Sequence, residues 1–383
     1  MKIVSVEALI IRVPRNWGGA GRLAAFPTRK VCPPISGEAL ETLLARVTTD
    51  SGLTGWGESQ ALAAPAVTGA IIHSILKPAL QGKHFGGTGL EIETLWDAMY
   101  NQMRVCGQTG GFMLDAFAAV DIALWDLAGK IHRAPIAALI AGRAAKPRLA
   151  CYVNYLAGDT RAERLERART CWQAGCRRFK IFHNASQREL LECYDALAAI
   201  CGPENIAVDA QWRLDPKTAP AFGAELDRRG ALWLECPFPP QDPAPHAALA
   251  ARIRTPLAIG ECYRTHVEMA PFFRAGAMRI VQPDLGRCGI TEALRIARAA
   301  ARAGMEIVPH LAPALGPLLF ATLQFAAATP NCRMVPHTPG LVETAGEYST
   351  SPVAFRNGHY TVPTAPGLGI DVAEPEVRLV EVA

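Results

Sequence analysis

The sequence predicts an α/β fold, in which a barrel of parallel strands and surrounding helices carries a smaller α+β domain. From about residue 148, short runs of Ile, Val, Leu and Ala alternate with longer Ala-, Arg- and Leu-rich stretches of helical periodicity. Apolar runs without polar alternation are typical of strands that are covered on both faces, as in parallel sheets. At 383 residues the chain also exceeds the roughly 250 residues of a barrel, so a second domain is expected.

The barrel is assigned to residues 131–349, and each of its eight expected strands coincides with one apolar run. The strands are expected at residues 149–156, 178–182, 206–211, 232–238, 257–262, 279–285, 306–310 and 333–337. Several of the stretches between them end in glycine, as helices often do. Because crossovers between parallel strands are right-handed, the repeated unit closes in one sense.

The second domain is assigned to residues 1–130, with residues 350–383 packing back on it. Periodicity and turn residues predict strands at 3–13 and 41–49, a turn with a short strand at 50–59, and helices at 68–80, 92–105 and 113–129. Two loops, at residues 15–27 and 58–67, contain Gly or Pro and are long enough to act as lids.

The composition excludes several classes of protein. Half of the residues are hydrophobic, 19% are charged and the net charge is only +4, without a basic patch of the kind that binds nucleic acid. No apolar run reaches the ~18 residues of a membrane span, and Glu7 interrupts the N-terminal apolar stretch, which is therefore expected to be a strand and not a signal peptide. The eleven cysteines form no CxxC pairs and are interpreted as reduced thiols. A cytoplasmic protein without nucleic-acid or membrane partners is expected.

Three acids follow directly on expected buried strands at a constant spacing. Asp209, Glu235 and Glu261 are separated by 26 residues each, about the length of one strand, loop, helix and loop. Because the C-terminal ends of barrel strands converge on one mouth, these carboxylates would crowd together and require a cation. Three hard oxygen ligands suit Mg²⁺. A helix N-cap role explains one such acid, but not three at one spacing.

Lys180, Asp284 and His310 stand at the ends of the second, sixth and seventh expected strands. Lys180 and His310 each have an ordinary alternative, since a Lys can extend its head to solvent and a His can be a satisfied core residue. In the mouth that holds the acids, however, a cation would lower the pKa of Lys180, and Asp284 would orient the imidazole of His310 as a general base. The sequence therefore predicts Lys180, His310 and Asp284 as catalytic residues.

These residues and several short motifs resemble the enolase superfamily, specifically the mandelate racemase branch of the mandelate racemase and muconate lactonizing enzyme family. The motifs are DSGLTGWGES from residue 50, KIF, VDAQW, ECPF, GEC, QPDLGRCGITEA, VPHLAP and NGHYTVPTAPGLGIDV. The resemblance covers nearly the whole chain. It implies a modified TIM barrel of the (β/α)7β type, with an α+β capping domain formed by the N-terminal part and the C-terminal tail.

The resemblance also implies a chemistry. Asp209, Glu235 and Glu261 would bind Mg²⁺, which holds a small-molecule carboxylate substrate while the proton α to that carboxylate is removed. The metal and hydrogen-bond donors would stabilise the enediolate, because such a carbon acid is very weak.

One departure from the branch lies on the second strand. The racemases of the branch carry a second Lys two residues after the first, on the face opposite the His, and Phe182 stands at that place. A strong base then remains on one face only, which disfavours racemisation but permits elimination: His310 takes the α proton and later protonates the departing β-hydroxyl. Lys180 would remain an electrostatic partner of the substrate carboxylate. His183 is either a second acid or a loop histidine.

A second departure lies on the eighth strand. The branch carries there a Glu that donates a hydrogen bond to the enediolate, and Pro336 takes its place. Proline has no such donor. Either His337 or another group replaces the hydrogen bond, or the second oxygen of the substrate is held differently.

Further substrate-binding candidates come from strand ends and from the first loop. Gln211 follows Asp209 by two residues and should point into the same mouth, while Asn154 ends the first strand. Trp17 and Arg22 belong to the predicted lid loop at residues 15–27, where Arg22 would meet a distal carboxylate or hydroxyls. A packing or surface role remains an equal alternative for each of them.

The predicted function is Mg²⁺-dependent dehydration of a sugar acid, an aldonate or aldarate, to a 2-keto-3-deoxy acid, which makes the protein a hydro-lyase. A cycloisomerase of a sugar-acid lactone or anhydro sugar acid is the first alternative, and a racemase or epimerase is the second. Outside enzymes, a silent acid-binding homologue remains. A metal-dependent hydrolase is disfavoured, because Cys151-Tyr-Val-Asn154 stands where such enzymes carry His-x-His. A homo-oligomer is expected.

Overall fold

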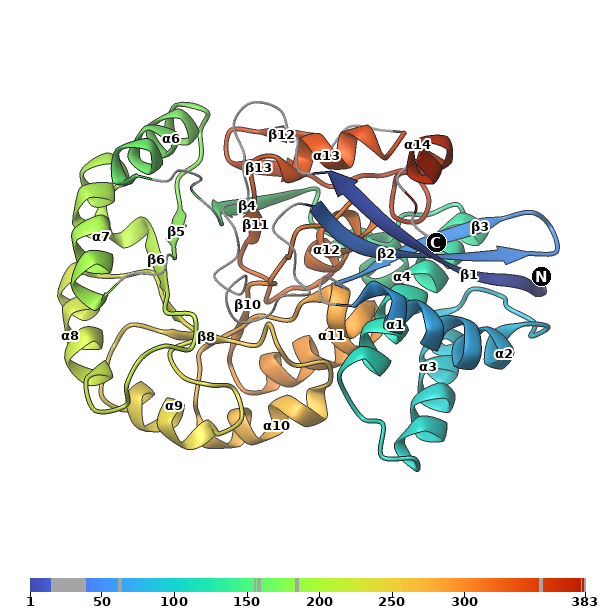
Figure 1. Ribbon diagram of the computed structural model, residues 1–383, viewed down its shortest axis with the longest axis horizontal. Coiled ribbons are helices and arrows are strands. Elements are labelled where there is room, and N and C mark those ends of the chain that lie inside the picture. Colours follow the sequence, from blue (N-terminus) through green and yellow to red (C-terminus); the bar gives the residue numbers. More distant parts are fainter. Residues whose placement is uncertain are drawn as a thin grey trace.

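A three-stranded cap and a parallel barrel lie side by side in the molecule (Figure 1). The computed structural model describes residues 1–14, 39–60, 64–154, 156, 160–182, 186–350, 354–379 and 381. No helix within these ranges combines the length and the hydropathy that a membrane span requires. The ten cysteines in these ranges are free thiols, as expected, and most of them are buried.

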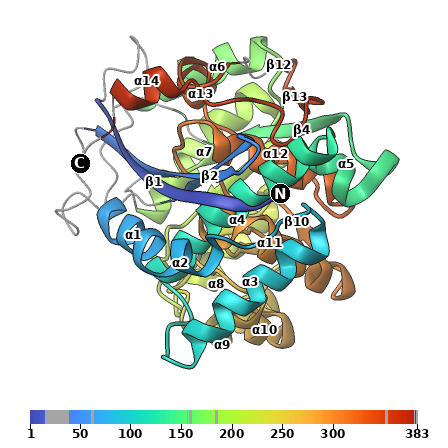
Figure 2. The same ribbon diagram turned by 90° about the vertical axis from the view of Figure 1, so that its right-hand side faces the viewer.

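The cap is an antiparallel sheet with helices packed against it. Its strands, paired in chain order, are β1 (Ile3–Pro14), β2 (Ala39–Thr49) and β3 (Thr54–Ser59). Its helical segments are α1 (Pro65–Ile71), the π-helical η2 (Ile72–Leu76), α2 (Lys77–Leu80), α3 (Gly89–Arg104) and α4 (Phe112–His132). Helices α1 and α2 run along β1 (Figure 2). These elements match the strands and helices expected from periodicity.

Helix α4 is the element between the cap sheet and the barrel. It contacts β3 on one side and α11 on the other, and every residue from 113 to 129 is buried. The β3 strand approaches α4 so closely that a Cβ at Gly57 would lie 1.9 Å from the carbonyl oxygen of Ala119. Only glycine leaves room for this contact, which explains the Gly-rich sequence of β3.

The barrel consists of eight parallel strands within the described ranges. They are β4 (Arg148–Val153), β5 (Phe179–Ile181), β6 (Ile206–Asp209), β7 (Leu234–Glu235), β8 (Leu257–Ile259), β9 (Ile280–Val281), β10 (Glu306–Ile307) and β11 (Val335–His337). Neighbouring strands pair in chain order, β11 pairs with β4, and a bridge between Ile307 and Cys332 closes the ring. Each strand lies inside a range predicted from sequence, apart from the first residue of β4.

Seven helices alternate with these strands in the described chain. They are α6 (Arg161–Gln173), α7 (Gln187–Cys201), α8 (Ala219–Arg229), α9 (Pro243–Ala250), α10 (His266–Ala275), α11 (Leu285–Arg302) and α12 (Pro317–Ala328). Short helices elsewhere are α5 (Ile136–Ala141), η3 (Gly142–Ala144), η4 (Pro203–Asn205), α13 (Leu341–Glu347) and α14 (Glu374–Leu379). The order of strands and helices confirms the predicted (β/α)7β barrel with an α+β cap.

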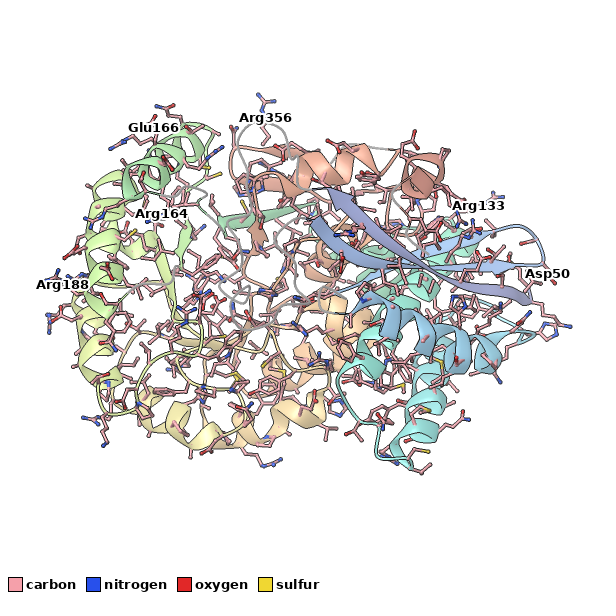
Figure 3. The ribbon with its side chains drawn as sticks, in the orientation of Figure 1. Asp50, Arg133, Arg164, Glu166, Arg188 and Arg356 are labelled. Atoms are coloured by element: carbon pink, nitrogen blue, oxygen red, sulfur yellow. The ribbon has the colours of Figure 1, made fainter. Side chains whose placement is uncertain are left out.

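Local sequence explains where several barrel helices begin. Thr160, Ser186 and Thr265 each accept a hydrogen bond from the backbone three residues later, and the Glu at that position bonds back to the cap residue. Such capping boxes satisfy amide groups that a helix leaves free at its start. On the outer helices, charged side chains such as Glu166 and Arg188 point away from the barrel (Figure 3).

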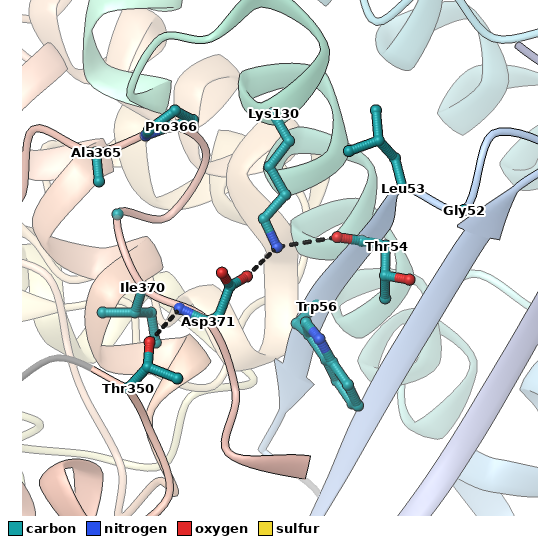
Figure 4. A pocket seen from close by; sticks show the side chains of 11 residues that line it. Gly52, Leu53, Thr54, Trp56, Lys130, Thr350, Ala365, Pro366, Ile370 and Asp371 are labelled. Carbon is teal, nitrogen blue, oxygen red and sulfur yellow. Dashed lines mark hydrogen bonds and ion pairs between the residues drawn. The ribbon is translucent and has the colours of Figure 1, made fainter.

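The C-terminal tail contacts both units. Strands β12 (Phe355–Arg356) and β13 (His359–Thr361) form a hairpin that pairs with β4 of the barrel, so the hairpin itself does not lie on the cap. The segment beyond it returns to the cap, where Lys130 of α4 donates to Asp371 (2.7 Å) and to the carbonyl of Thr54 (2.9 Å). These residues line a cavity of about 460 Å³ between cap and tail (Figure 4).

Candidate active site

The inner face of the barrel carries an apolar floor below a polar layer. The floor is a cluster of seven buried side chains: Tyr152, Ala207, Trp233, Ala258, Ile280, Val308 and Met334. Because side chains alternate along a strand, the residues two positions later also point inward, toward the C-terminal mouth. These residues are Asn154, Asp209, Glu235, Gly260, Gln282, His310 and Pro336. The polar layer therefore contains four of the predicted site residues: Asn154, Asp209, Glu235 and His310.

Lys180 of β5 reaches into this layer. Its side chain is 2% exposed, forms an ion pair with Glu235, and lies 3.5 Å from Oδ2 of Asp209. Burial opposes its charge, but the carboxylates of Glu235 and Asp209 outweigh burial and hold the pKa of the ammonium well above its ordinary value. A bound cation was expected to lower this pKa, whereas the carboxylates by themselves raise it. Lys180 is therefore a fixed positive charge beside the two acids.

Glu235 is the most enclosed of the three acids, with a fully buried side chain. Oε1 contacts Lys180, while Oε2 accepts hydrogen bonds from Nε1 of Trp233 (2.9 Å) and Nε2 of Gln282 (2.8 Å). Burial acts to raise its pKa, but Lys180 and Gln282 lower the pKa below the ordinary value. Glu235 is thus held as a carboxylate.

Asp209 ends β6 and pairs in register with Glu235. Its Oδ1 accepts a hydrogen bond from the backbone amide of Gln211 (2.8 Å), and its side chain is 12% exposed. Burial, together with the charges of Glu235 and Glu261, raises the pKa of Asp209 to about 7 against the opposing effect of Lys180. The single ammonium of Lys180 therefore does not balance the negative charge of the three acids.

Glu261 does not occupy the position equivalent to the other two acids, although its spacing in sequence is the same. Glu235 pairs with Ala258, so Glu261 lies three residues further along, beyond the end of β8. Gly260 makes this turn with a φ of 150°, and a Cβ there would lie 2.7 Å from the backbone nitrogen of Gln282. The glycine allows the chain to bend so that the side chain of Glu261 approaches His310.

His310 and Asp284 form the predicted dyad. Nδ1 of His310 lies 2.5 Å from Oδ2 of Asp284, which is fully buried, and Nε2 lies 3.3 Å from Oε2 of Glu261. Burial lowers the pKa of His310, but Glu261 and Asp284 outweigh burial and raise the pKa above its ordinary value. Asp284 also caps α11 by accepting from the amide of Gly286 (2.8 Å). The amide of Gly286 thus holds one oxygen of Asp284, and the other oxygen orients the imidazole of His310.

The structure brings two of the predicted substrate-binding residues to this layer. Asn154 is 9% exposed, and its Nδ2 lies 3.5 Å from Oγ1 of Thr338. Gln211 follows β6 with a φ of 50°, a left-handed conformation that turns its side chain at the strand end. The buried oxygens Oδ1 of Asn154 and Oε1 of Gln211 have no hydrogen-bond partner in the described part of the chain. Both can accept hydrogen bonds from a ligand.

His337 is not brought to the site. Since Met334 faces the barrel interior, Pro336 faces it too and His337 points outward. Its ring stacks on Phe355 with centroids 3.8 Å apart, and Nδ1 lies 2.7 Å from the hydroxyl of Tyr360. Burial lowers the pKa of His337 to about 4. The histidine holds the tail hairpin and does not replace the donor missing at Pro336.

Three other predicted residues, Trp17, Arg22 and His183, lie outside the described residues. Phe182 is described: its ring centroid lies 5.8 Å from Nζ of Lys180. An aromatic ring therefore lies beside Lys180, at the position where the racemases of the branch carry their second Lys.

Sequence reasoning missed Trp233 and Gln282, which bind Glu235, and Tyr152, whose ring packs edge-on against Trp233 with centroids 5.1 Å apart. Trp233 stands two residues before Glu235, and Gln282 stands two residues before Asp284. The alternation of side chains along a strand was the available signal, since residues two apart share a face.

The donor set of the mouth fits a small, hard cation. Asp209, Glu235 and Glu261 offer carboxylate oxygens, and buried oxygens of Asn154, Gln211 and Gln282 have no partner among the described residues. In the described ranges, no three His, Cys, Asp or Glu side chains are arranged so that they could hold a metal ion as they stand. Asp209 and Glu235 are paired neighbours on β6 and β7, so two of the three proposed ligands already stand side by side.

Comparisons with known proteins place this geometry in a family. The family model described as "Enolase C-terminal domain-like" matches residues 163–377. The model of the N-terminal domain of mandelate racemase and muconate lactonizing enzyme matches residues 36–141. Together the two models cover most of the cap and the barrel.

Known proteins of similar sequence align with most of this chain. A D-galactarolactone cycloisomerase of Agrobacterium fabrum is 30% identical, covering 86% of this chain and 88% of the relative. A D-galactonate dehydratase of Verminephrobacter eiseniae is 29% identical, covering 87% and 89%.

Solved structures agree with these relatives. An enolase superfamily member from Agrobacterium tumefaciens has a TM-score of 0.90 and 29% identity, covering 100% of this chain and 99% of its own. The L-talarate dehydratase of Polaromonas sp. JS666, solved with Mg and L-glucarate, has a TM-score of 0.83 and 25% identity, covering 100% and 98%. The family models, the relatives and the strand-end acids agree, and the chain belongs to the mandelate racemase and muconate lactonizing enzyme family of the enolase superfamily.

Proposed function

We propose that this protein is a Mg²⁺-dependent hydro-lyase that converts a sugar acid, an aldonate or aldarate, into a 2-keto-3-deoxy acid. The observation that carries the proposal is the His310–Asp284 dyad, whose Nε2 lies 3.3 Å from Oε2 of Glu261 in the mouth that also contains Asp209 and Glu235. The names of relatives support the substrate class, since they include a D-galactonate dehydratase and an arabinonate dehydratase.

His310 carries the proton transfers. Its Nε2 takes the proton from the carbon α to the substrate carboxylate, while Asp284 holds Nδ1 and stabilises the imidazolium. The carbon–oxygen bond at the β carbon then breaks, and His310 returns the proton to the departing hydroxyl, which leaves as water. The resulting enol becomes the 2-keto acid.

Lys180 and the acids serve the substrate carboxylate. Asp209, Glu235 and Glu261 would hold the cation, and Mg²⁺ supplies positive charge beside the substrate carboxylate as its α carbon loses a proton. Lys180 adds a second positive charge from the floor of the site. Asn154 and Gln211 would contact the hydroxyls of the substrate, and Trp17, Arg22 and His183 remain proposed contacts.

Within the described part of the chain, the site has a base on one face only. Phe182 lies beside Lys180 where the racemases of the branch have a second Lys, and Pro336 faces the interior without a donor. Elimination needs one acid–base residue, whereas racemisation needs one on each face. The one-sided arrangement therefore favours dehydration over racemisation.

Cycloisomerisation is the second candidate, because the galactarolactone cycloisomerase is 30% identical to this chain. Opening a lactone by loss of the ring oxygen also begins with removal of an α proton and needs one base. The two reactions differ in mass balance: dehydration releases one water, whereas the isomer keeps the mass of the lactone.

A substrate panel with Mg²⁺ tests both reactions. Aldonates, aldarates and their lactones are incubated with the enzyme, and products are detected as 2-keto acids and weighed by mass spectrometry. A keto acid one water lighter than an open-chain acid supports dehydration. Conversion of lactones alone, at constant mass, overturns it in favour of cycloisomerisation.

Exchange of the α proton in D₂O tests the base. We expect His310→Asn to lower exchange and turnover by about 10²- to 10⁴-fold. The control His337→Asn should keep both, because that side chain faces the tail hairpin. Exchange that continues unchanged in His310→Asn would falsify the assignment, and no exchange with any acid would support a silent homologue.

A further inference from the structure

The three acids of the mouth differ in how firmly the protein holds them. Glu235 is fully buried and contacts three donors, whereas the side chains of Asp209 and Glu261 are 12% and 16% exposed. Besides the ion pair with Lys180, Asp209 accepts one backbone hydrogen bond, and the described contact of Glu261 is with His310. Glu235 is the acid whose orientation is fixed before any cation binds.

Two neutral residues provide this fixation on the side away from Lys180. Trp233 stands two residues before Glu235 on β7 and donates its indole N–H to Oε2 (2.9 Å). Gln282 follows β9 and donates from Nε2 to the same oxygen (2.8 Å). The reversed amide of Gln282 would set its carbonyl oxygen against a carboxylate oxygen, so the donating orientation is the stable one.

Neither donor is free to move. Trp233 and Gln282 are fully buried, and the indole packs edge-on against Tyr152 with an interplanar angle of 87°. The indole N–H cannot accept a proton, and neither side chain carries a charge. They hold the carboxylate without competing with a cation, as a second Lys at either position would.

The carboxylate of Glu235 still has capacity for a cation. A carboxylate offers about four acceptor sites, and the three donors around Glu235 use three of them. Donors that hold a ligand in place are known to change metal affinity by about 10- to 100-fold, because they remove the cost of orienting the ligand.

We propose that Trp233 and Gln282 are positioning residues that clamp Glu235 in the orientation that receives the cation, and so set the Mg²⁺ affinity of the site. The inference rests on the metal site of the proposed function, but not on the identity of the sugar acid. Trp233 also becomes an optical reporter, since its indole touches a proposed metal ligand.

The test is direct titration of Mg²⁺ without substrate. Trp233→Phe and Gln282→Met each remove one donor and put an apolar side chain of similar bulk in its place. Each should raise the Mg²⁺ dissociation constant by about 10-fold or more, measured by calorimetry. In the double variant, the dissociation constant should rise by less than the product of the two single fold-changes, because both donors bind the same oxygen.

Matched controls exist in the same chain. Trp125 is a buried indole that donates to Oγ1 of Thr291 (3.0 Å), and Gln324 is a fully buried amide that donates to the carbonyls of Pro363 and Leu368. Trp125→Phe and Gln324→Met should leave the Mg²⁺ dissociation constant unchanged. Circular dichroism confirms that each variant is folded.

Fluorescence gives a second readout. Mg²⁺ should change the tryptophan emission of the wild-type protein and of Trp125→Phe, and this change should disappear in Trp233→Phe. Wild-type affinity in both Trp233→Phe and Gln282→Met overturns the clamp. Wild-type protein that binds no Mg²⁺ overturns the metal site itself, whereas binding without turnover of any sugar acid leaves the clamp standing and contradicts the dehydratase proposal.

Discussion

Lys180 carries much of the charge balance of the mouth at the scale of single residues. Its ammonium contacts Asp209 and Glu235, and these acids hold its pKa well above the ordinary value even though burial opposes the charge. A cation at the acids would take over part of this balance. The stability of the apoprotein and its response to Mg²⁺ are therefore linked through one side chain.

We expect Lys180→Met to lower the free energy of unfolding by about 3–5 kcal/mol without Mg²⁺, because two buried carboxylates lose their partner. Added Mg²⁺ should restore part of this loss, as measured by urea unfolding. The control is Lys130→Met, since Lys130 also lies between two acids, Asp126 and Asp371, but in the cavity between cap and tail, which none of the mouth residues line. The same Mg²⁺ response in both variants would contradict a cation site at Asp209 and Glu235.

His337 makes a pH-dependent contribution of its own. Burial holds its pKa at about 4 in the folded protein, compared with 6.5 for an ordinary histidine. As pH falls, the unfolded chain binds the proton first, so the contribution of His337 is complete above pH 6.5 and is lost as pH falls toward 4. The shift corresponds to a loss of roughly 3 kcal/mol.

Urea unfolding at a series of pH values checks this expectation. In His337→Phe the ring can still stack on Phe355, but the titrating group is gone. The slope of unfolding free energy against pH between about 6.5 and 4 should therefore be smaller in the variant. Equal slopes would show that His337 does not titrate in this window.

The turn after β8 decides the position of Glu261 at the scale of elements. Gly260 has a φ of 150°, and a Cβ there would lie 2.7 Å from the backbone of Gln282. We expect Gly260→Ala to cost about 1–3 kcal/mol of stability and to weaken Mg²⁺ binding, because Glu261 is displaced. Urea unfolding and calorimetry measure the two effects.

Gly276→Ala is the matched control for this turn. Gly276 also has a positive φ, 63°, but a Cβ there would meet nothing within 4 Å. The control should lose about 1 kcal/mol through backbone strain and keep its Mg²⁺ affinity. Mg²⁺ binding that is equally strong in both variants would sink the role given to Gly260.

Glu58 joins the cap to the barrel at the scale of the whole molecule. This fully buried acid of β3 accepts hydrogen bonds from the amides of Leu315 (2.6 Å), Gly316 (3.1 Å) and Leu318 (3.1 Å). Those amides lie at the start of α12, a few residues after His310. The cap thereby holds the segment that carries the base.

We expect Glu58→Ala to lower the free energy of unfolding by about 3 kcal/mol or more, because several buried amides lose a charged acceptor. Turnover should fall as well, since the loop after His310 loosens. In the control Glu91→Ala, the amides of Gly86 and Gly87 lose a half-buried carboxylate near the surface, which should cost less than about 1 kcal/mol. Equal losses in the two variants would contradict the coupling of cap and barrel.

The sequence by itself determined the barrel, the cap and most of the site. Apolar runs that end in acids are readable without a structure, because a parallel strand is buried on both faces and its C-terminal end faces the mouth. The placement of Asp209, Glu235, Lys180, Asp284 and His310 followed from this pattern. The metal-ligand and catalytic roles given to them stay predictions, as does the domain boundary near residue 130.

Only the tertiary structure decided which way individual side chains point and what they contact. A strand buried on both faces shows no alternation of polarity, so the outward direction of His337 could not be read from its neighbours. The bend at Gly260 and the contacts of Glu235 with Trp233 and Gln282 depend on the register between β7, β8 and β9. Register is set by packing of the whole barrel, which no single segment of sequence contains.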